Sequence, residues 1–496
     1  MSAGTGQMRQ EWRTGLKRYL STTPCILLGI LILAALLRLL HLGSESLWYD
    51  EVVTVAIVRL DWGVFWKVLS HFEASMGLYY CLLRLWVNLG ESEFVLRSLS
   101  ALAGVLGVGL VYVLGKRLFD TKVGLIGAAL LATHSFHIQY SQEARAYSLM
   151  VFLTALSSLF FLRAIEHSSR NEWAGYILTA TLAVYTHSLS VLVLGAHWVW
   201  LVFVRRRNIP WRGFLVAVLA ISMLLVPLAI FALAHGTGQT SWIPRTRPHD
   251  AYNLFNSLVG GGRLLLLAYF VPCAIAFLCP LKAWVQWKEL FKTWSYTFLL
   301  SWLFVPLVTG IVISLGKPVL VPRYFIMCLP PLILLAAVGI SQIRPSWISV
   351  VSLIVLLSLS ARAVLRYYSD VHKEDWRGAT AYVVSHASPK DGIIFYHGRG
   401  RFGFDYYVRR LNPEAQTWQI VFPEPYDWTD FLGKAMVQPS DSMVRTIAKG
   451  YRRVWLVLSH NDQMETPVIE TTLQGNFPDA RKQGFRGVQV LLYQQN

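Results

Sequence analysis

The chain has 496 residues, of which 54% are hydrophobic and only 15% are charged. Soluble domains carry charge on about a quarter of their residues, so this composition excludes an ordinary soluble protein and indicates an integral membrane protein. The formal net charge of +17 does not indicate a nucleic-acid partner, because the basic residues fall in short clusters between apolar segments, as the positive-inside bias produces.

The N-terminal segment is expected to anchor the chain in the membrane. Residues 1–20 carry a basic cluster, and an apolar run follows at 24–42. That run is close to the roughly 20 residues needed to cross a bilayer. It is longer than the core of a usual signal peptide and lacks a small-residue cleavage site, which predicts an uncleaved span with a cytoplasmic N-terminus.

The first polar stretch after this span is Leu47–Glu51, with the sequence LWYDE. Two adjacent carboxylates are out of place in a chain that only needs to cross a bilayer, so Asp50 and Glu51 are candidates for chemistry. The aromatic side chains of Trp48 and Tyr49 lie beside them in the sequence. The alternative is that both acids cap the next helix, because acidic residues suit a helix N-terminus.

The apolar block 76–89 decides the orientation of everything after it. Counting it as a span would place the basic loop 115–122 outside, whereas counting it as an interfacial helix places that loop and the later basic loops inside. The block is short for a span and carries Arg84, Trp86 and two tyrosines, as an interfacial helix would. This favours about eleven spans, at residues 24–42, 94–114, 123–137, 147–165, 173–187, 189–204, 214–235, 263–281, 295–315, 323–343 and 347–367.

The sequence becomes polar after the last span. It contains three short β-type runs, Gly392–Tyr396, Arg453–Leu458 and Val488–Tyr493, and Arg377–His386 has a helical pattern. We therefore expect a transmembrane domain at residues 1–368 and a small α/β domain at residues 369–496. An odd number of spans places this domain on the outer face with LWYDE, as a structural or partner-binding cap.

The predicted topology gathers acids, histidines and cations at the outer ends of the spans, whereas the cytoplasmic loops carry scattered Lys and Arg. Such groups are costly near hydrocarbon, so a cavity at the outer leaflet explains them most simply. Its candidate members are Asp50, Glu51, Asp61, Lys67, His71, Glu73, His134, His137, Gln139, Tyr140, Gln142, Glu143, Arg145, Tyr147, Tyr185, His187, Ser188, Trp242, Arg245, Arg247, Lys317, Arg323 and Tyr324.

This mixture of side chains suits glycosyl transfer from a polyprenyl-phosphate sugar. A carboxylate can accept the proton of an attacking hydroxyl, and arginine or lysine can hold the departing phosphate. The adjacent Asp50–Glu51 pair also differs from the DxD pattern that nucleotide-sugar enzymes use to hold a metal-bound diphosphate. Both features favour a lipid-phosphate donor over a nucleotide sugar.

No cofactor is certain, and a divalent metal ion stays an open alternative. His134 and His137 form an HxxH pattern that could hold a metal with Glu143, but three dispersed ligands are a weak signal. The five cysteines lie in or beside apolar segments without a CxxC pattern, so they indicate neither a disulfide framework nor a zinc site.

The order and spacing of several motifs resemble the GT-C superfamily of membrane glycosyltransferases. The resemblance covers about residues 20–365 and is stronger to the bacterial branch related to protein O-mannosyltransferases and the lipid A aminoarabinose transferase. Its motifs are LWYDE, then GLYYCLLRLW, SEFVLRSLSAL, YSQEARAYSL and PRYFIMCLPPLILL. It implies a GT-C-like polytopic helical fold and an inverting transfer, with Asp50 as the base and Glu51 as the second acid.

The resemblance also implies which residues bind the substrates. Glu143, Arg145 and Tyr147 match the second outer loop of such enzymes, and Arg323 and Tyr324 match an arginine–tyrosine pair near the donor phosphate. Tyr49, Tyr79 and His187 complete the residues expected to bind donor or acceptor.

The motif order departs from the family at one place. Many relatives have His-Pro-Pro before the Leu-Tyr-Tyr of the interfacial helix, whereas this chain has Ser75, Met76 and Gly77 there. Serine cannot replace a histidine that touches donor or acceptor, which leaves the acceptor class and the details of the phosphate contact open. His71, four residues earlier, is the candidate substitute.

The expected partners are a polyprenyl-phosphate sugar, a lipid, glycan or protein acceptor, and the lipids of the inner or plasma membrane. Two other functions stay open. A transporter or flippase for a lipid-linked substrate would more often show repeat halves and broken helices near the midplane. A non-catalytic membrane scaffold would instead work through its outer domain.

Overall fold

The computed structural model describes residues 4–203, 209–235, 243–285, 290–370, 373–411, 418–423, 438–459 and 467–495. The chain divides into two compact units. Unit 1 contains Met1–Leu40, Ser75–Tyr79 and Arg97–Ser369, and unit 2 contains His41–Ala74, Tyr80–Leu96 and Asp370–Asn496.

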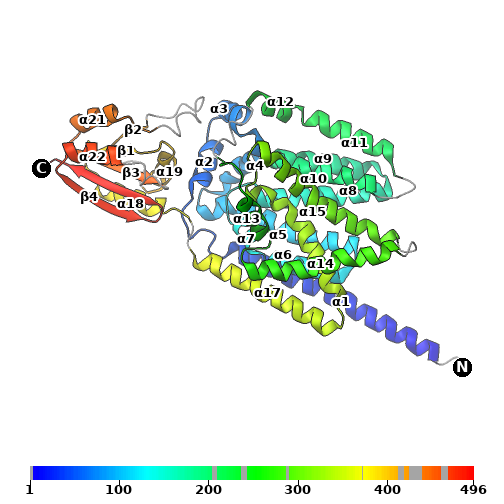
Figure 1. The fold of residues 1–496 in the computed structure, drawn as a ribbon. Helices are drawn as coiled ribbons and strands as arrows, with labels where there is room; N and C mark the ends of the chain where they lie inside the picture. Colours follow the sequence, from blue (N-terminus) through cyan, green and yellow to red (C-terminus); the bar gives the residue numbers. More distant parts are fainter. Residues whose placement is uncertain are drawn as a thin grey trace. The chain divides into compact units, whose positions relative to one another are not determined.

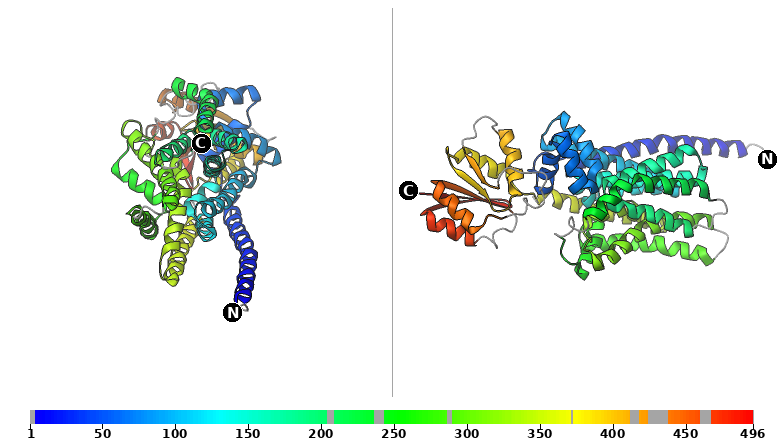
Figure 2. Two further views of the ribbon diagram at one scale, coloured as in Figure 1. Left: turned by 90° about the vertical axis from the view of Figure 1, so that its right-hand side faces the viewer. Right: turned by 90° about the horizontal axis from the view of Figure 1, so that it is seen from above.

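Unit 1 is a bundle of helices that lie side by side, seen from two further directions in Figure 2. Within the bundle, α8 packs against α9, α14 against α16, α10 against α15, and α6 against α16. The helices are α1 (Gly4–Leu39), α5 (Glu93–Leu118), α6 (Thr121–Ala132), α7 (Ser135–Ser141), α8 (Tyr147–His167), α9 (Arg170–Thr186), α10 (Val191–Phe203), α11 (Trp211–Leu224), α12 (Val226–His235), α13 (Pro248–Leu258), α14 (Arg263–Val285), α15 (Leu290–Gly316), α16 (Leu329–Gln342) and α17 (Ser346–Ser369), with short turns η4 (Ser188–Ser190) and η7 (Pro322–Cys328). The first turn of α5, up to Leu96, belongs to unit 2.

Local sequence signals set several of these helix ends. The Asp120 side chain accepts a hydrogen bond from the Val123 N–H at 2.8 Å and so caps α6. Ser169 caps α9 in the same way by accepting from Glu172 N–H. Large apolar side chains remain exposed on the outer faces of the bundle, for example Leu219 and Met223 on α11 and Ile354 on α17. Exposed apolar surface of this extent suits contact with lipid.

The predicted spans fall on helical segments, but not all of them are single helices: 123–137 runs from α6 into α7, and 214–235 covers both α11 and α12. The number of spans is not confirmed. Six helices among the described residues are long and apolar enough to cross a membrane, and the number rises to eight if each of two bent pairs is one span. The pairs are α11 with α12, bent by 47°, and α13 with α14, bent by 75°. Helix α6 has only 12 residues and α9 only 17, so the structure supports a multi-span protein without fixing eleven spans.

The block predicted to lie in the membrane surface forms α4 (Gly77–Trp86), followed by the single turn η3 (Val87–Leu89). Its 10 residues extend about 15 Å at the helical rise. That length is too short for a bilayer core of about 30 Å. The structure therefore agrees with the expectation that this block does not cross the membrane.

Glycines allow the helices of unit 1 to approach one another closely. A Cβ atom on Gly339 of α16 would lie 1.8 Å from the carbonyl oxygen of Pro272 on α14. A Cβ on Gly115 of α5 would lie 2.8 Å from the Cα of Gly124 on α6. Small residues at crossing points are a general device of membrane helix packing, because dispersion contacts replace the hydrophobic effect there.

Unit 2 combines short helices with a five-stranded sheet. Its first part holds α2 (Tyr49–Val58), α3 (Trp62–Val68), and the turns η1 (Leu69–Glu73) and η2 (Ala74–Met76), the last of which crosses into unit 1. Its second part holds α18 (Trp376–His386), β1 (Gly392–Phe395), α19 (Gly400–Leu411), β2 (Gln419–Phe422), α21 (Asp441–Gly450), β3 (Arg453–Ser459), α22 (Pro467–Asn476), β4 (Asp479–Phe485) and β5 (Val488–Gln494).

The sheet has the strand order β2-β1-β3-β5-β4. Strand β1 pairs in parallel with β2 and β3, whereas β5 pairs antiparallel with β3 and β4. One face packs on α21 and α22 through Leu456, Ile447 and Leu473. On strand β3 the next residue, Trp455, points to the opposite face and meets Tyr382 of α18, so helices cover both faces (Figure 1).

The three predicted strands and the predicted helix at 377–386 are all present as β1, β3, β5 and α18. The predicted small α/β element after the last span is therefore confirmed. Compact unit 2 also includes 41–74 and 80–96, which lie well before the predicted boundary. The division into domains at 1–368 and 369–496 stays a prediction.

Candidate active site

Asp50 and Glu51 lie in the first turn of α2, in unit 2. Trp48 precedes the helix with extended backbone, and its N–H donates to the Glu51 carboxylate at 3.4 Å. Both acids therefore occupy the helix end that favours negative charge. Glu51 therefore caps the first turn of α2, and the catalytic roles of Asp50 and Glu51 stay predictions.

The two acids differ in their surroundings. Glu51 is fully buried and forms an ion pair with Lys373, whose Nζ lies 3.2 Å from Oε2. Asp50 is only partly buried, and its backbone carbonyl accepts a hydrogen bond from the Thr54 hydroxyl at 2.7 Å. Because a general base must reach the proton it removes, the accessible Asp50 suits that role better than Glu51.

Tyr49 lies beside these acids, and the Arg399 guanidinium stands 5.8 Å from the centre of its ring. Farther along α2, a cavity of about 350 Å³ opens between α2 and α19. Arg59 and Arg409 contribute positive charge to its lining, and Phe402 and Tyr406 contribute aromatic surface. Its size and mixed lining fall within the usual range of small-molecule sites.

The second group of predicted residues lies in unit 1 and comes from separate segments of the chain. Arg145 and Tyr147 stand at the start of α8, His187 ends α9, and Arg323 and Tyr324 belong to η7. The His187 ring lies 6.1 Å from the Tyr147 ring and 5.0 Å from the Tyr324 ring. The fold thus joins three predicted segments in one cluster.

Two cations act on this cluster. The side chains of Arg145 and Arg323 both lie near the His187 ring. Arg145, Tyr147 and His187 are buried, as is Glu143. The Arg323 guanidinium also lies 5.8 Å from the centre of the Tyr324 ring. Guanidinium groups can supply charge for a phosphate, and aromatic rings can supply flat apolar surface for a sugar.

Tyr79 is connected to the same region through a chain of hydrogen bonds. Its hydroxyl bonds the Ser100 hydroxyl at 2.8 Å, and the Ser100 hydroxyl donates to the Arg145 carbonyl at 3.0 Å. Arg145 Nη2 also lies 3.5 Å from the sulfur of Met76. Tyr79 therefore bonds a hydrogen-bonding partner of Arg145, and Met76, at the place where the chain departs from the family, contacts Arg145 itself.

The proposed substitute histidine, His71, is exposed, and its Nδ1 contacts the Lys67 carbonyl at 2.8 Å and the Ser70 hydroxyl at 3.0 Å. Glu73 accepts a hydrogen bond from the Tyr80 hydroxyl at 3.1 Å. All three contacts lie within unit 2 and hold the turn that follows α3.

The HxxH pattern is built into the packing of unit 1. His134 Nε2 contacts the Leu258 carbonyl at 3.1 Å, and His137 Nδ1 lies 2.7 Å from Arg38 Nη2. Among the described residues, no group of three or more His, Cys, Asp or Glu side chains is arranged to hold a metal ion. The metal stays an open alternative.

Of the other outer-loop cations, Arg247 precedes α13, and its backbone N–H donates to Asp250 at 2.7 Å. Arg245 and Lys317 are exposed. Trp242 lies outside the described residues.

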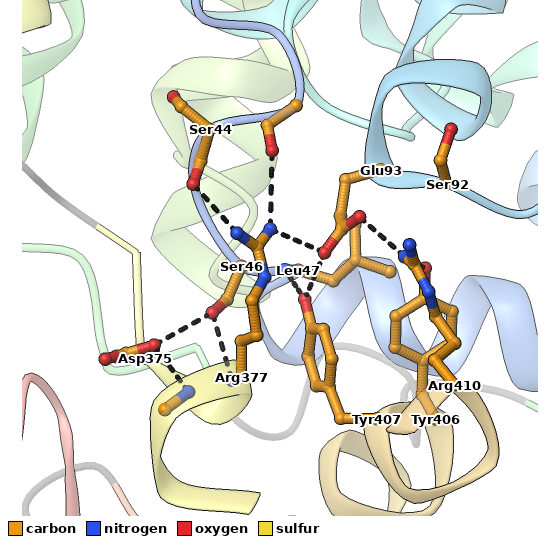
Figure 3. Close-up of polar contacts among 12 residues, drawn as sticks. Ser44, Ser46, Leu47, Ser92, Glu93, Asp375, Arg377, Tyr406, Tyr407 and Arg410 are labelled. Atoms are coloured by element: carbon orange, nitrogen blue, oxygen red, sulfur yellow. Dashed lines mark hydrogen bonds and ion pairs between the residues drawn. The ribbon is translucent and has the colours of Figure 1, made fainter. Parts of the chain in front are cut away.

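The sequence did not indicate the buried hub around Glu93, at the start of α5. Its carboxylate pairs with Arg377 and Arg410, each at 2.6 Å, and accepts from the Tyr407 hydroxyl at 3.0 Å (Figure 3). Burial and the Glu93 charge raise the pKa of Tyr407, so its hydroxyl keeps the proton it donates. Burial alone would lower the pKa of Arg377, but the bond to Glu93 outweighs it and raises that pKa.

Arg38 was also missed, although it left a signal. It is a charged residue inside the first apolar run, where charge is costly and therefore marks a specific role. It is fully buried and donates to the carbonyls of Ala34, Leu131 and Ala132 at 3.0 to 3.1 Å. By contrast, nothing in the polar sequence around Lys373 or Arg377 sets them apart from exposed basic residues.

Residues 77–235 match the family described as dolichyl-phosphate-mannose-protein mannosyltransferase. An undecaprenyl phosphate-alpha-4-amino-4-deoxy-L-arabinose arabinosyl transferase from Pseudomonas aeruginosa is 27% identical over a region covering 70% of this chain. That region spans 66% of the relative's own length.

Solved structures share the fold over almost the whole chain. ArnT from Cupriavidus metallidurans in the apo state has a TM-score of 0.64 at 13% identity, covering 96% of this chain and 98% of its own. The same protein bound to undecaprenyl phosphate gives 0.61 at 12% identity, covering 94% and 97%. The archaeal oligosaccharyltransferase AglB from Archaeoglobus fulgidus, with an inhibitory peptide and a dolichol-phosphate, gives 0.52 at 12% identity, covering 92% and 71%. The chain therefore has the fold of the GT-C membrane glycosyltransferases and is similar in sequence to the protein mannosyltransferases and aminoarabinose transferases among them.

Proposed function

We propose that the chain is a membrane glycosyltransferase that moves a sugar from a polyprenyl-phosphate donor to an acceptor hydroxyl on the extracytoplasmic face. The observation that carries the proposal is the match, over 96% of the chain, to the fold of ArnT. The same fold was solved with undecaprenyl phosphate bound, which favours a lipid-linked donor over a soluble nucleotide sugar.

The proposed reaction inverts the configuration at the anomeric carbon. The acceptor oxygen attacks that carbon while Asp50 takes its proton, and the bond between the carbon and the phosphate oxygen breaks. Polyprenyl phosphate leaves with the bonding electrons. A poor nucleophile needs such a base, because a hydroxyl attacks well only as its proton is removed.

Cations are proposed to stabilise the departing phosphate. Arg145 and Arg323 are the candidates, because both lie near the buried His187, whose ring is close to Tyr147 and Tyr324. A planar guanidinium can bind two phosphate oxygens at once and stabilises the charge that develops as the bond breaks. Tyr49, Tyr79, Glu143, Tyr147, His187 and Tyr324 are proposed to shape the donor and acceptor sites, and Glu51 to support Asp50.

The topology proposed for this function has about eleven spans, a cytoplasmic N-terminus and an extracytoplasmic C-terminal domain. The positions of the basic loops support it. The acceptor is a hydroxyl of a lipid, a glycan or a protein, and a lipid is favoured by the resemblance to the aminoarabinose transferases.

The test is a transfer assay with the purified full-length chain in nanodiscs. A set of undecaprenyl-phosphate sugars is offered with lipid acceptors, and both the released undecaprenyl phosphate and the product mass are measured. We expect release of undecaprenyl phosphate together with a glycosylated product. Transfer from a soluble nucleotide sugar alone would contradict the proposed donor, and movement of the intact donor across vesicles without bond cleavage would instead indicate a flippase.

The sugar and acceptor can be identified in cells. Deleting the chain should remove one sugar mass from a lipid, glycan or protein of the envelope, and mass spectrometry of these fractions measures it. Restoring the unaltered chain should return the mass, whereas the Asp50→Asn variant should not. Return of the mass with Asp50→Asn would favour the scaffold function.

A further inference from the structure

The segment that carries Asp50 is held on both sides by residues from the later part of unit 2. Before Asp50, the Leu47 N–H donates to the Tyr407 hydroxyl of α19 at 2.8 Å. After Asp50, the Glu51 carboxylate pairs with Lys373 at 3.2 Å. Asp50 therefore lies between two contacts whose partners come from far along the chain. We call the Leu47–Tyr407 contact the upstream anchor and the Glu51–Lys373 contact the downstream anchor.

Further hydrogen bonds hold Ser46, the residue directly before Leu47. The Ser46 hydroxyl donates to the Asp375 carboxylate at 3.3 Å and accepts from the Arg377 N–H at 3.2 Å. The same Asp375 oxygen accepts from the Gly378 N–H at 2.9 Å and caps α18. Ser46 is thus docked on the N-terminus of a helix.

The Arg377 guanidinium extends this docking to the start of the segment. It donates to the carbonyls of Gly43 and Ser44, both at 3.3 Å, and to Glu93 at 2.6 Å (Figure 3). Buried Glu93 also accepts from Arg410 and from the Tyr407 hydroxyl. Charge-assisted bonds that share one buried carboxylate form a rigid group.

The Tyr407 hydroxyl links the two ends of this arrangement. It donates to Glu93 and accepts from the Leu47 N–H. It therefore connects the buried group around Glu93 to the backbone three residues before Asp50. Helix α19, which carries Tyr407, also packs directly against α2, the helix that begins with Asp50.

We propose that the C-terminal segment 373–410 positions Asp50 for proton transfer, with Lys373 and Tyr407 as the positioning residues. This inference rests on the proposed function of Asp50 as base. It assigns the α/β element a part in turnover, beyond that of a structural cap.

The burial of the ion pair gives this arrangement its effect. Glu51 is 0% exposed and Lys373 is 9% exposed. Removing one partner of such a pair leaves a buried charge without its counter-ion, which favours a shift of the first turn of α2 toward water or protonation of Glu51. A shift of about 1 Å in a reacting group costs on the order of a hundredfold in rate.

The first variant is Tyr407→Phe in the full-length chain. It keeps the ring and removes the hydroxyl that holds Leu47. We expect faster amide hydrogen exchange across residues 44–51, together with a fall in kcat of roughly tenfold to a hundredfold and an unchanged KM for the undecaprenyl-phosphate sugar. A merely structural role would lower thermal stability without separating kcat from KM.

The second pair of variants tests the downstream anchor. Lys373→Met should lower kcat and speed exchange at residues 49–52, and Lys373→Arg should restore much of both, because it keeps the charge. Lys449→Met is the matched control, because Lys449 is an exposed lysine on α21. That control should leave kcat, KM and exchange unchanged.

The outcomes separate this inference from the proposed function. Wild-type kcat in Tyr407→Phe and Lys373→Met, with Asp50→Asn inactive, would overturn the positioning role and leave the transferase intact. A raised donor KM with unchanged kcat would also overturn it, because it would assign the anchors to binding. If the unaltered chain transfers no sugar, the proposed function fails. Unchanged exchange at 44–51 in both variants would overturn the anchoring itself.

Discussion

At the scale of single residues, Asp50 and Glu51 are neighbours with different surroundings. Glu51 is buried and paired with Lys373, whereas Asp50 is partly exposed at the start of α2. A carboxylate neutralised by a buried ammonium is a poor proton acceptor, because the ammonium stabilises its charged form. Separate roles for the two acids are the prediction that follows from these surroundings.

The first prediction concerns the base. Asp50→Asn keeps the shape and hydrogen bonding of the side chain but cannot accept a proton, so turnover should fall on the order of a hundredfold to ten-thousandfold. Donor binding and thermal stability should stay unchanged, and both are measured on the same preparation. Asp479→Asn, which alters the first residue of β4, is the control and should remain active. Normal turnover in Asp50→Asn would place the base elsewhere.

The second prediction concerns the phosphate. Arg145→Lys and Arg323→Lys should weaken donor binding, and the alanine variants should weaken it more, because an ammonium meets phosphate as a point charge. Binding of undecaprenyl phosphate to the purified variants measures this. Arg163→Ala is the control, since Arg163 on α8 pairs with Glu172. Equal affinity of both alanine variants and the unaltered chain would remove these arginines from the phosphate site.

At the scale of elements, close approaches decide where the helices of unit 1 cross. Helices α14 and α16 touch where Gly339 faces the Pro272 carbonyl, and α5 meets α6 where Gly115 faces Gly124. Backbone at these crossings cannot move away as a flexible side chain would. The sequence offers many glycines, and only the packed structure shows which ones are required.

The third prediction tests one such crossing. Gly339→Ala introduces a Cβ against backbone and should destabilise unit 1 by about 1–3 kcal/mol, the usual cost of overpacking. Thermal unfolding in detergent measures the change. Gly195→Ala on α10 is the matched control, because a Cβ there has nothing within 4 Å. Equal melting temperatures for the two variants would contradict this prediction, because α14 and α16 would then separate without loss of stability.

At the scale of the whole molecule, orientation in the membrane follows from loop charge. The fourth prediction is that a phosphatase reporter, active only outside the cytoplasm, is active when fused after Asn496. Green fluorescent protein fused at the same position should not fluoresce, because it would be exported unfolded. Activity of a strictly cytoplasmic reporter at that position would reverse the proposed topology. Fusions after Lys122, in a basic loop expected inside, provide the control.

The comparisons favour the glycosyltransferase expected from the motifs over a transporter. The match at residues 77–235 overlaps the stretch that carries GLYYCLLRLW and YSQEARAYSL. The bent pairs α11 with α12 and α13 with α14 show that broken helices occur here too. Bent helices alone therefore do not distinguish the two functions, and the transfer assay proposed above does.

Local pattern determined much of this protein. Long apolar runs predicted the helices of unit 1, because a chain in lipid must satisfy its backbone hydrogen bonds within helices. The β-type runs predicted β1, β3 and β5, since those strands are buried and apolar. Strand β4 (Asp479–Phe485) was missed because its exposed polar sequence carries no such signal.

Only the tertiary structure decided which polar residues act together. In the sequence, the acids and cations of the predicted outer loops form one set of candidate site residues. The fold instead places Asp50 and Glu51 in unit 2 and Arg145, His187 and Arg323 in unit 1. It also pairs Glu51 with Lys373, which follows it by more than three hundred residues. Such pairs leave no trace in local sequence, because hydrophobic periodicity reports which face of an element is buried and not which distant side chain it meets.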